Sequence, residues 1–194
     1  MAFQFTIVFV LLVVCLATPA WADYKAGMDA YDRGDYATAM REWSPLAKLG
    51  LAAAQFRLGQ LYANGEGVPQ DYVQARQWYE KAALQGDSSA QLNLGVLYEN
   101  GNGVPKDYQL ALFWYRRSAQ HGNAMTLTKL GGMYEHGNGV LRDVVQAQKC
   151  YILGAAGGDK LAAELRDSLA KQMTPAQIFQ AQEQAREWKR NPSY

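Results

Sequence analysis

The sequence contains few of the residues from which compact chemical sites are built. It has two cysteines, Cys15 and Cys150, and two histidines, His121 and His136. Neither histidine has a second histidine or a cysteine at ligand spacing, so we predict no metal site. No Ser-His-Asp arrangement or pair of carboxylates stands out, so we predict no catalytic residue and no cofactor. A catalytic group assembled from distant residues stays open as an alternative.

An excess of charge of one sign is also missing. The 194 residues include 19 lysines and arginines against 18 aspartates and glutamates, with no basic run or stripe. This balance argues against nucleic acid as a partner. The hydrophobic fraction of 49% is typical of a folded chain.

The first 22 residues hold no charged side chain. Ile7 to Ala17 is an unbroken apolar run, and Ala20-Trp21-Ala22 then places small residues where a signal peptidase cleaves. We therefore predict a signal peptide at residues 1–22, cleaved after Ala22, and a periplasmic or secreted protein with no stable membrane insertion. An uncleaved anchor is the alternative, although the run is shorter than the ~20 apolar residues that span a bilayer. Cleavage would remove Cys15 and leave no intramolecular disulfide.

A pattern with a period of 36 residues is written three times in register. Its first copy contains Leu58-Gly59-Gln60-Leu61-Tyr62, Gly65-Glu66-Gly67-Val68-Pro69, Asp71-Tyr72, Ala75, Trp78-Tyr79, Ala82 and Gly86. A fixed period of this length is typical of a solenoid. The apolar spacing on either side of the glycine loop indicates two helices in each copy, so we predict an all-α fold.

Local signals predict where the helices of each copy begin and end. In the first copy, the first helix runs roughly from Ala52 to Asn64 and ends at Gly65, because glycine tolerates the positive φ of a helix C-cap. Asp71 is placed to cap the second helix, and Gly86 ends it. Small residues such as Gly59 let the helix axes approach.

The pattern LGxLYxxGxGVPxDYxxAxxWYxxAA resembles the Sel-one-like repeat (SLR) family, a branch of the tetratricopeptide (TPR) superfamily. The resemblance implies a right-handed α-α superhelix, a TPR/SLR-type solenoid of antiparallel helix hairpins. With a signal peptide, it further implies a bacterial envelope or secreted adaptor. The third copy departs from the pattern at Leu141, Val144 and Cys150. Since Cys150 replaces a packing tryptophan, we predict that its thiol is buried and inert.

The repeat divides the chain into six segments. After the signal peptide at 1–22, residues 23–50 form a degenerate N-terminal TPR-like hairpin. Three repeats follow at 51–86, 87–122 and 123–158, and residues 159–194 form C-terminal capping helices. In that last segment, Thr174 to Gln177 reads as a capping box, and Ile178, Phe179, Ala185 and Trp188 are expected to face the array.

Twelve positions on the predicted first helices vary from copy to copy, and the resemblance implies that this face lines a concave groove. We predict that a protein or peptide partner binds there, with apolar anchors between Tyr24 and Phe56 and a basic group near Glu99 and Glu135. The alternative is that these residues pack against the chain itself or are solvated surface. This variable stripe comprises Tyr24, Met28, Tyr31, Phe56, Gln60, Ala63, Leu92, Val96, Glu99, Thr128, Gly132 and Glu135.

These observations favour an exported, non-enzymatic scaffold or adaptor that is a monomer or weakly self-associating. One alternative is a cell-wall-active enzyme, either a β-lactamase or a peptidoglycan hydrolase. Ser168 and Lys171 match the Ser-x-x-Lys of serine β-lactamases, but the Ser-Asp-Asn and Lys-Thr-Gly partners do not occur. The other alternative is an envelope assembly factor that self-associates.

Overall fold

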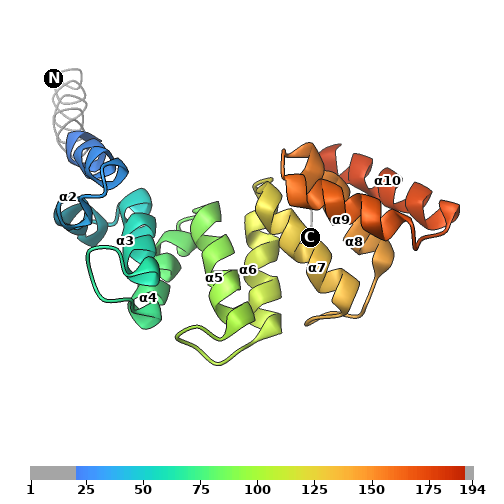
Figure 1. Ribbon diagram of the computed structural model, residues 1–194, viewed down its shortest axis with the longest axis horizontal. Coiled ribbons are helices and arrows are strands. Elements are labelled where there is room, and N and C mark those ends of the chain that lie inside the picture. The colour runs from blue at the N-terminus through green and yellow to red at the C-terminus, as the bar shows by residue number, and fades with distance from the viewer. Residues whose placement is uncertain (1–20, 191–194) are drawn as a thin grey trace, which may run out of the picture. The chain divides into compact units, whose positions relative to one another are not determined.

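The computed structural model describes residues 21–190, and all regular elements among them are α-helices (Figure 1). The predicted all-α solenoid class is thereby confirmed. None of the described helices has the length and apolar character needed to cross a bilayer. The predicted signal peptide lies outside the described residues except for its last two positions. The chain divides into two compact units, Met1–Gln85 and Gly86–Tyr194, which are considered separately.

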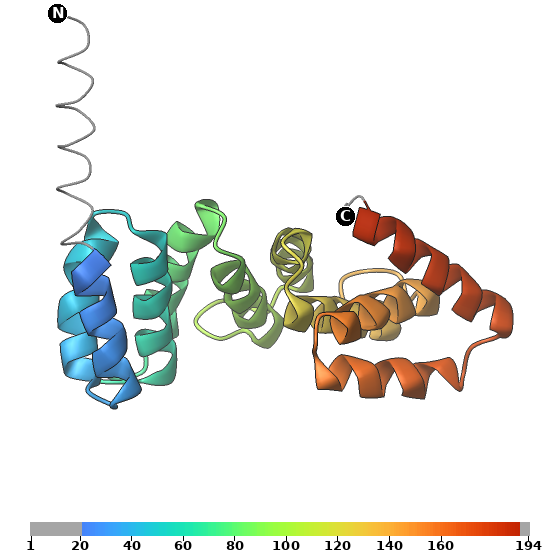
Figure 2. The same ribbon diagram turned by 90° about the horizontal axis from the view of Figure 1, so that it is seen from above.

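The first unit contains four helices in its described part. They are a helix over residues 21–32, α2 (Tyr36–Lys48), α3 (Ala52–Asn64) and α4 (Tyr72–Leu84). In this unit α3 packs against both α2 and α4 (Figure 2). The core forms around Trp43, which is fully buried together with Leu58 and Leu61.

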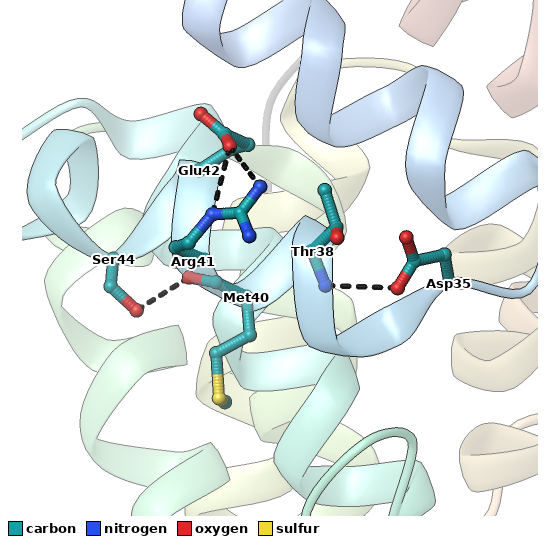
Figure 3. A network of polar contacts seen from close by, with 6 residues as sticks. All are labelled: Asp35, Thr38, Met40, Arg41, Glu42 and Ser44. Carbon is teal, nitrogen blue, oxygen red and sulfur yellow. Dashed lines mark hydrogen bonds and ion pairs between the residues drawn. The ribbon is translucent and has the colours of Figure 1, made fainter.

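The helix α2 is held at its N-terminus and along its length by local contacts (Figure 3). The Asp35 carboxylate accepts from the backbone N–H of Thr38 at 3.1 Å, which satisfies one donor of the first turn. Pro45 lies inside the helix and cannot donate a backbone hydrogen bond. One residue earlier, the Ser44 hydroxyl donates to the Met40 carbonyl at 2.6 Å.

The second unit contains six helices in its described part. They are α5 (Ser88–Asn100), α6 (Tyr108–Gln120), α7 (Ala124–His136), α8 (Val144–Ala156), α9 (Lys160–Ala170) and α10 (Pro175–Arg190). Within this unit α5 packs on α6, α6 on α7, α7 on α8, and α8 on both α9 and α10. Its core includes Tyr115, Leu130 and Cys150, each without exposed surface, so the predicted burial of Cys150 is confirmed.

In each repeat hairpin a tyrosine ring packs directly against the backbone of a glycine on the facing helix. A Cβ added at Gly59 would lie 2.5 Å from the ring of Tyr79. The corresponding distance is 2.3 Å from Gly95 to Tyr115. Real carbon atoms pack no closer than ~3.5 Å, so only glycine allows these helices to approach to this distance. The small-against-large packing predicted from Gly59 is therefore confirmed.

Turn residues end and begin the helices where the sequence predicts. α3 spans Ala52–Asn64, and Gly65 caps it with a φ of 73° in the left-handed region. The Asp71 carboxylate begins α4 by accepting from the N–H groups of Val73 at 2.9 Å and Gln74 at 3.0 Å.

The C-terminal segment follows its predicted capping box. The Thr174 N–H donates to Gln177 Oε1 at 2.9 Å, and the Gln177 N–H donates back to Thr174 Oγ1 at 3.3 Å. Ala185 is buried as expected. Phe179 is 63% exposed, so the expectation that it faces the array is wrong. The inward position on α10 belongs to Ala181, which has no exposed surface.

Candidate functional site

The variable stripe lies on the first helix of each hairpin: residues 21–32 and α3 in the first unit, and α5 and α7 in the second. Six of its members belong to the first unit, and all six side chains are half-buried. They are Tyr24, Met28, Tyr31, Phe56, Gln60 and Ala63.

The aromatic members of the first unit pack against rings of their own unit. Tyr24 and Tyr31 have ring centroids 6.2 Å and 5.8 Å from that of Trp43. Phe56 lies 5.9 Å from Tyr79 by the same measure. Much of the expected apolar anchor surface is therefore used in packing, as the alternative interpretation states for this part of the stripe.

One cation in the first unit was missed by sequence reasoning. The Arg57 guanidinium lies 5.9 Å from the ring centroid of Tyr31, 6.0 Å from that of Trp43 and 5.7 Å from that of Phe56. Burial and the hydrogen-bonded Glu66 carboxylate raise the pKa of Tyr31. The face predicted to be apolar therefore carries a cation held among aromatic rings.

Two members of the stripe in the second unit are buried. Leu92 is 7% exposed and belongs to the core around Tyr115. Thr128 is also 7% exposed, and its hydroxyl donates to the Asp159 carboxylate. The prediction that Leu92 and Thr128 stand free on an open surface is wrong, because neighbouring helices cover them. Val96 is half-buried and packs against the same core.

The two glutamates of the stripe bond to the buried tyrosines of the repeat. The Tyr115 hydroxyl donates to Glu99 Oε2, and the Tyr151 hydroxyl donates to Glu135 Oε2, both at 2.6 Å. Burial, and then the hydrogen-bonded glutamate, raise the pKa of both tyrosines far above the ordinary value of 10.0. Lys129 Nζ also lies 3.0 Å from Glu99 Oε2, so the chain itself supplies a basic group beside that glutamate.

Three members of the stripe come together in a pocket with a volume of about 390 Å³. They are Glu99, Thr128 and Gly132. A Cβ added at Gly132 would meet only the Tyr151 hydroxyl, at 3.9 Å, so the missing side chain leaves the space open. The remaining wall comes from α7, the loop after it and α9: Met125, Lys129, His136, Asn138, Asp159, Leu161 and Leu165.

The pocket combines apolar walls with a mildly acidic rim. Met125 is 60% exposed and Leu161 is 54% exposed, so both present apolar surface to solvent. Asp159 accepts from the N–H of Leu161 at 3.0 Å, and it lines the pocket together with the ion pair of Glu99 and Lys129. The pocket therefore has two carboxylates and one ammonium group, which favours a ligand that carries an apolar side chain next to a basic one.

Sequence reasoning missed Met125 and Leu161 because neither belongs to the variable stripe. Leu161 lies beyond the third repeat, where the 36-residue period provides no register. Their exposure, which marks them as surface apolar groups, is visible only in the structure.

The side chains considered above as catalytic groups or metal ligands do not form a site within the described residues. Ser168 and Lys171 are both exposed, at the end of α9. Among residues 21–190, no group of three or more His, Cys, Asp or Glu side chains is placed to hold a metal ion.

Comparisons with known proteins identify the repeat. A family model of the Sel1 repeat matches residues 52–87, 88–123 and 124–159, each starting one residue after the boundary expected from the sequence. No curated protein matches the chain.

Two solved structures are similar to the chain. A Sel1 repeat protein from Oxalobacter formigenes is 33% identical with a TM-score of 0.73, over 90% of this chain and 74% of that one. A protective antigen present in uropathogenic Escherichia coli strains, which displays an SLR fold, is 40% identical with a TM-score of 0.70. That match covers 74% of this chain and 32% of the antigen, so this chain spans about a third of its length. Since the matched repeats cover more than half of the 194 residues, the chain belongs to the Sel1 repeat family.

Proposed function

We propose that this protein is an exported, non-enzymatic scaffold that binds a segment of a partner protein in the pocket between α7 and α9. Sel1 repeat proteins generally act as scaffolds for protein–protein interactions. The observation that carries the proposal is the pocket itself, in which exposed Met125 and Leu161 flank a space left open by Gly132.

The chemistry of the pocket indicates what the partner segment contains. Met125, Leu161 and Leu165 would receive a large apolar side chain, whose burial contributes on the order of 2 kcal/mol. Asp159 and Glu99 would favour a lysine or arginine next to it. This retains the predicted basic contact at Glu99 and moves the apolar anchors from the segment between Tyr24 and Phe56 to α7 and α9.

The pocket is tested by cross-linked affinity capture from the native envelope with purified protein. We expect the double variant Met125→Glu with Leu161→Glu to lose the partners that the unaltered protein captures, because two carboxylates would stand in the apolar wall. Both side chains are exposed, so the helical content should not change.

A matched control keeps the result specific. Leu141 is 91% exposed and is not among the residues that line the pocket, so Leu141→Glu should capture the same partners as the unaltered protein. Equal capture by the pocket variant and the control variant would refute the pocket as the binding site. Turnover of a chromogenic β-lactam by the purified protein would instead support the enzyme alternative.

Export is a separate part of the proposal and needs its own measurement. Ala20-Trp21-Ala22 predicts a mature protein that begins at Asp23. Mass spectrometry of the protein recovered from a periplasmic fraction should show that N-terminus. A chain that starts at Met1 and stays in the membrane fraction would favour the uncleaved anchor.

A further inference from the structure

A second hollow lies on α6, away from the residues that line the α7–α9 pocket. It has a volume of about 320 Å³, and six residues of α6 line it. These residues, the α6 patch, are Gln109, Leu112, Phe113, Arg116, Arg117 and Gln120. They recur at helical spacing and therefore form one continuous stripe along the helix.

The α6 patch carries positive charge that the chain does not neutralise. The helix contains Arg116 and Arg117 and no aspartate or glutamate. In the described part of the chain neither guanidinium forms an ion pair. The equivalent helix of the preceding repeat, α4, places Glu80 where α6 has Arg116, and Glu80 pairs with Arg76 at 2.5 Å.

Aromatic rings position one of the two guanidinium groups. Arg117 lies 5.5 Å from the ring centroid of Phe113 and 5.9 Å from that of Trp114. The two rings form an edge-to-face pair with centroids 5.0 Å apart. Phe113 is nevertheless 48% exposed, so an apolar ring and a cation are presented together.

The other guanidinium is fixed from the side of α7. Arg116 Nη2 donates to the Tyr134 hydroxyl at 3.0 Å, while its Nε is buried and has no acceptor in the described structure. Because Nε is buried, a bound carboxylate would meet the terminal nitrogens of the Arg116 guanidinium. Guanidinium groups bind carboxylates through two parallel hydrogen bonds.

The remaining residues suit a polypeptide. Leu112 is 5% exposed and forms an apolar floor beside Phe113. Gln120 is exposed at one end of the patch, where its amide can pair with backbone groups of a bound chain. At the other end, the Gln109 amide N–H already donates to the Gly139 carbonyl at 2.7 Å. A peptide offers all three complements at once: carboxylates, an apolar side chain and backbone amides.

We propose that the α6 patch binds an acidic segment of a partner protein, with a glutamate or aspartate at Arg116 and Arg117 and an apolar side chain against Phe113. This surface is separate from the α7–α9 pocket, so its occupancy does not depend on the function proposed above. The two surfaces would let one scaffold hold two segments of opposite charge.

The test uses a fluorescein-labelled peptide of about ten residues with glutamates around a Leu-Phe pair, and fluorescence anisotropy with the full mature chain. We expect binding that weakens as salt is added and weakens at least tenfold in the double variant Arg116→Gln with Arg117→Gln. The same peptide with glutamines in place of glutamates should bind at least tenfold more weakly to the unaltered protein.

Controls separate the patch from general charge and from unfolding. Arg33→Gln with Lys48→Gln removes the same charge from exposed positions of the first unit and should leave the affinity unchanged. Because Arg116 contacts Tyr134, the single variants Arg117→Gln and Phe113→Ala serve if the double variant loses helical content.

Three outcomes would overturn the proposal. They are no binding of the acidic peptide, equal affinity of the patch variants and the unaltered protein, and equal loss in the Arg33 and Lys48 control. Binding of vesicles that contain anionic phospholipid, without binding of the peptide, would also overturn it and assign the patch to a membrane surface.

Discussion

Substitution by alanine should change the free energy of unfolding in opposite directions at two adjacent glycines of α7, Gly131 and Gly132. A Cβ added at Gly131 would lie 2.4 Å from Cε1 and 2.6 Å from Cδ1 of Tyr151. At Gly132 the nearest atom outside the helix would be the Tyr151 hydroxyl, at 3.9 Å. A comparison of the two alanine variants therefore separates the cost of close packing from the gain in helix propensity within one helix.

The magnitude follows from what Tyr151 can do in response. Its ring is 1% exposed and packs with Ala147 and Leu169, so it cannot move without disturbing the core. Overpacking of this kind costs about 3 kcal/mol, and loss of the hydrogen bond to Glu135 adds about 2 kcal/mol. The higher helix propensity of alanine stabilises the folded state by about 1 kcal/mol. We therefore expect Gly131→Ala to destabilise the protein by about 4 kcal/mol.

For Gly132→Ala only the propensity gain remains, so this variant should be more stable by about 1 kcal/mol. Urea unfolding followed by circular dichroism measures both. With a denaturant slope of about 2 kcal/mol per M, the midpoints of the two variants should differ by more than about 2 M. Equal midpoints would refute the argument that glycine at Gly131 is required by the approach of Tyr151.

Three further predictions concern protonation, capping and the thiol. Because the pKa values of Tyr115 and Tyr151 are raised in the folded state, only the unfolded chain loses these protons near pH 10, so stability should be full below about pH 10 and decline above it. Urea midpoints between about pH 9 and about pH 11 test this, and Tyr115→Phe with Tyr151→Phe should flatten the decline. Asp107 accepts from the N–H groups of Gln109 at 2.8 Å and Leu110 at 3.0 Å, so Asp107→Ala should cost about 1 kcal/mol in the same assay, whereas Asp107→Asn should cost less. In a Cys15→Ser chain, Cys150 should react with a thiol reagent only in denaturant, since it has no exposed surface; rapid reaction of the native protein would contradict its burial.

The bounds of the helices were predictable because their signals are local. Gly65 ends α3 and Asp71 caps α4 at the positions read from the repeat. A left-handed φ or a capping carboxylate depends on a few neighbouring residues, and those recur with the period. The close contact of Gly59 with Tyr79 also followed, because the copies conserve a small residue opposite a large one.

The candidate site was only partly predictable, because variation between copies does not measure exposure. Leu92 and Thr128 vary, and both are nevertheless buried. Glu99 and Glu135 looked free, and they accept from tyrosines on the neighbouring helix. Each of these contacts joins residues at least 16 positions apart, which the spacing within one helix cannot reveal.

The order of residues in this chain was sufficient to establish a solenoid of helix hairpins and the positions of its turns, since both depend on periodic apolar contacts and on glycine and aspartate at the turns. It was not sufficient to say which side chains face solvent. The pocket between α7 and α9 exists because Asp159 and Leu161 lie beside residues of α7 that are unremarkable in their own segment, and Arg116 of the α6 patch is held by Tyr134 of α7. Exposure, charge pairing and open volume are properties of neighbours in space, so the folded arrangement alone decided where a partner could bind.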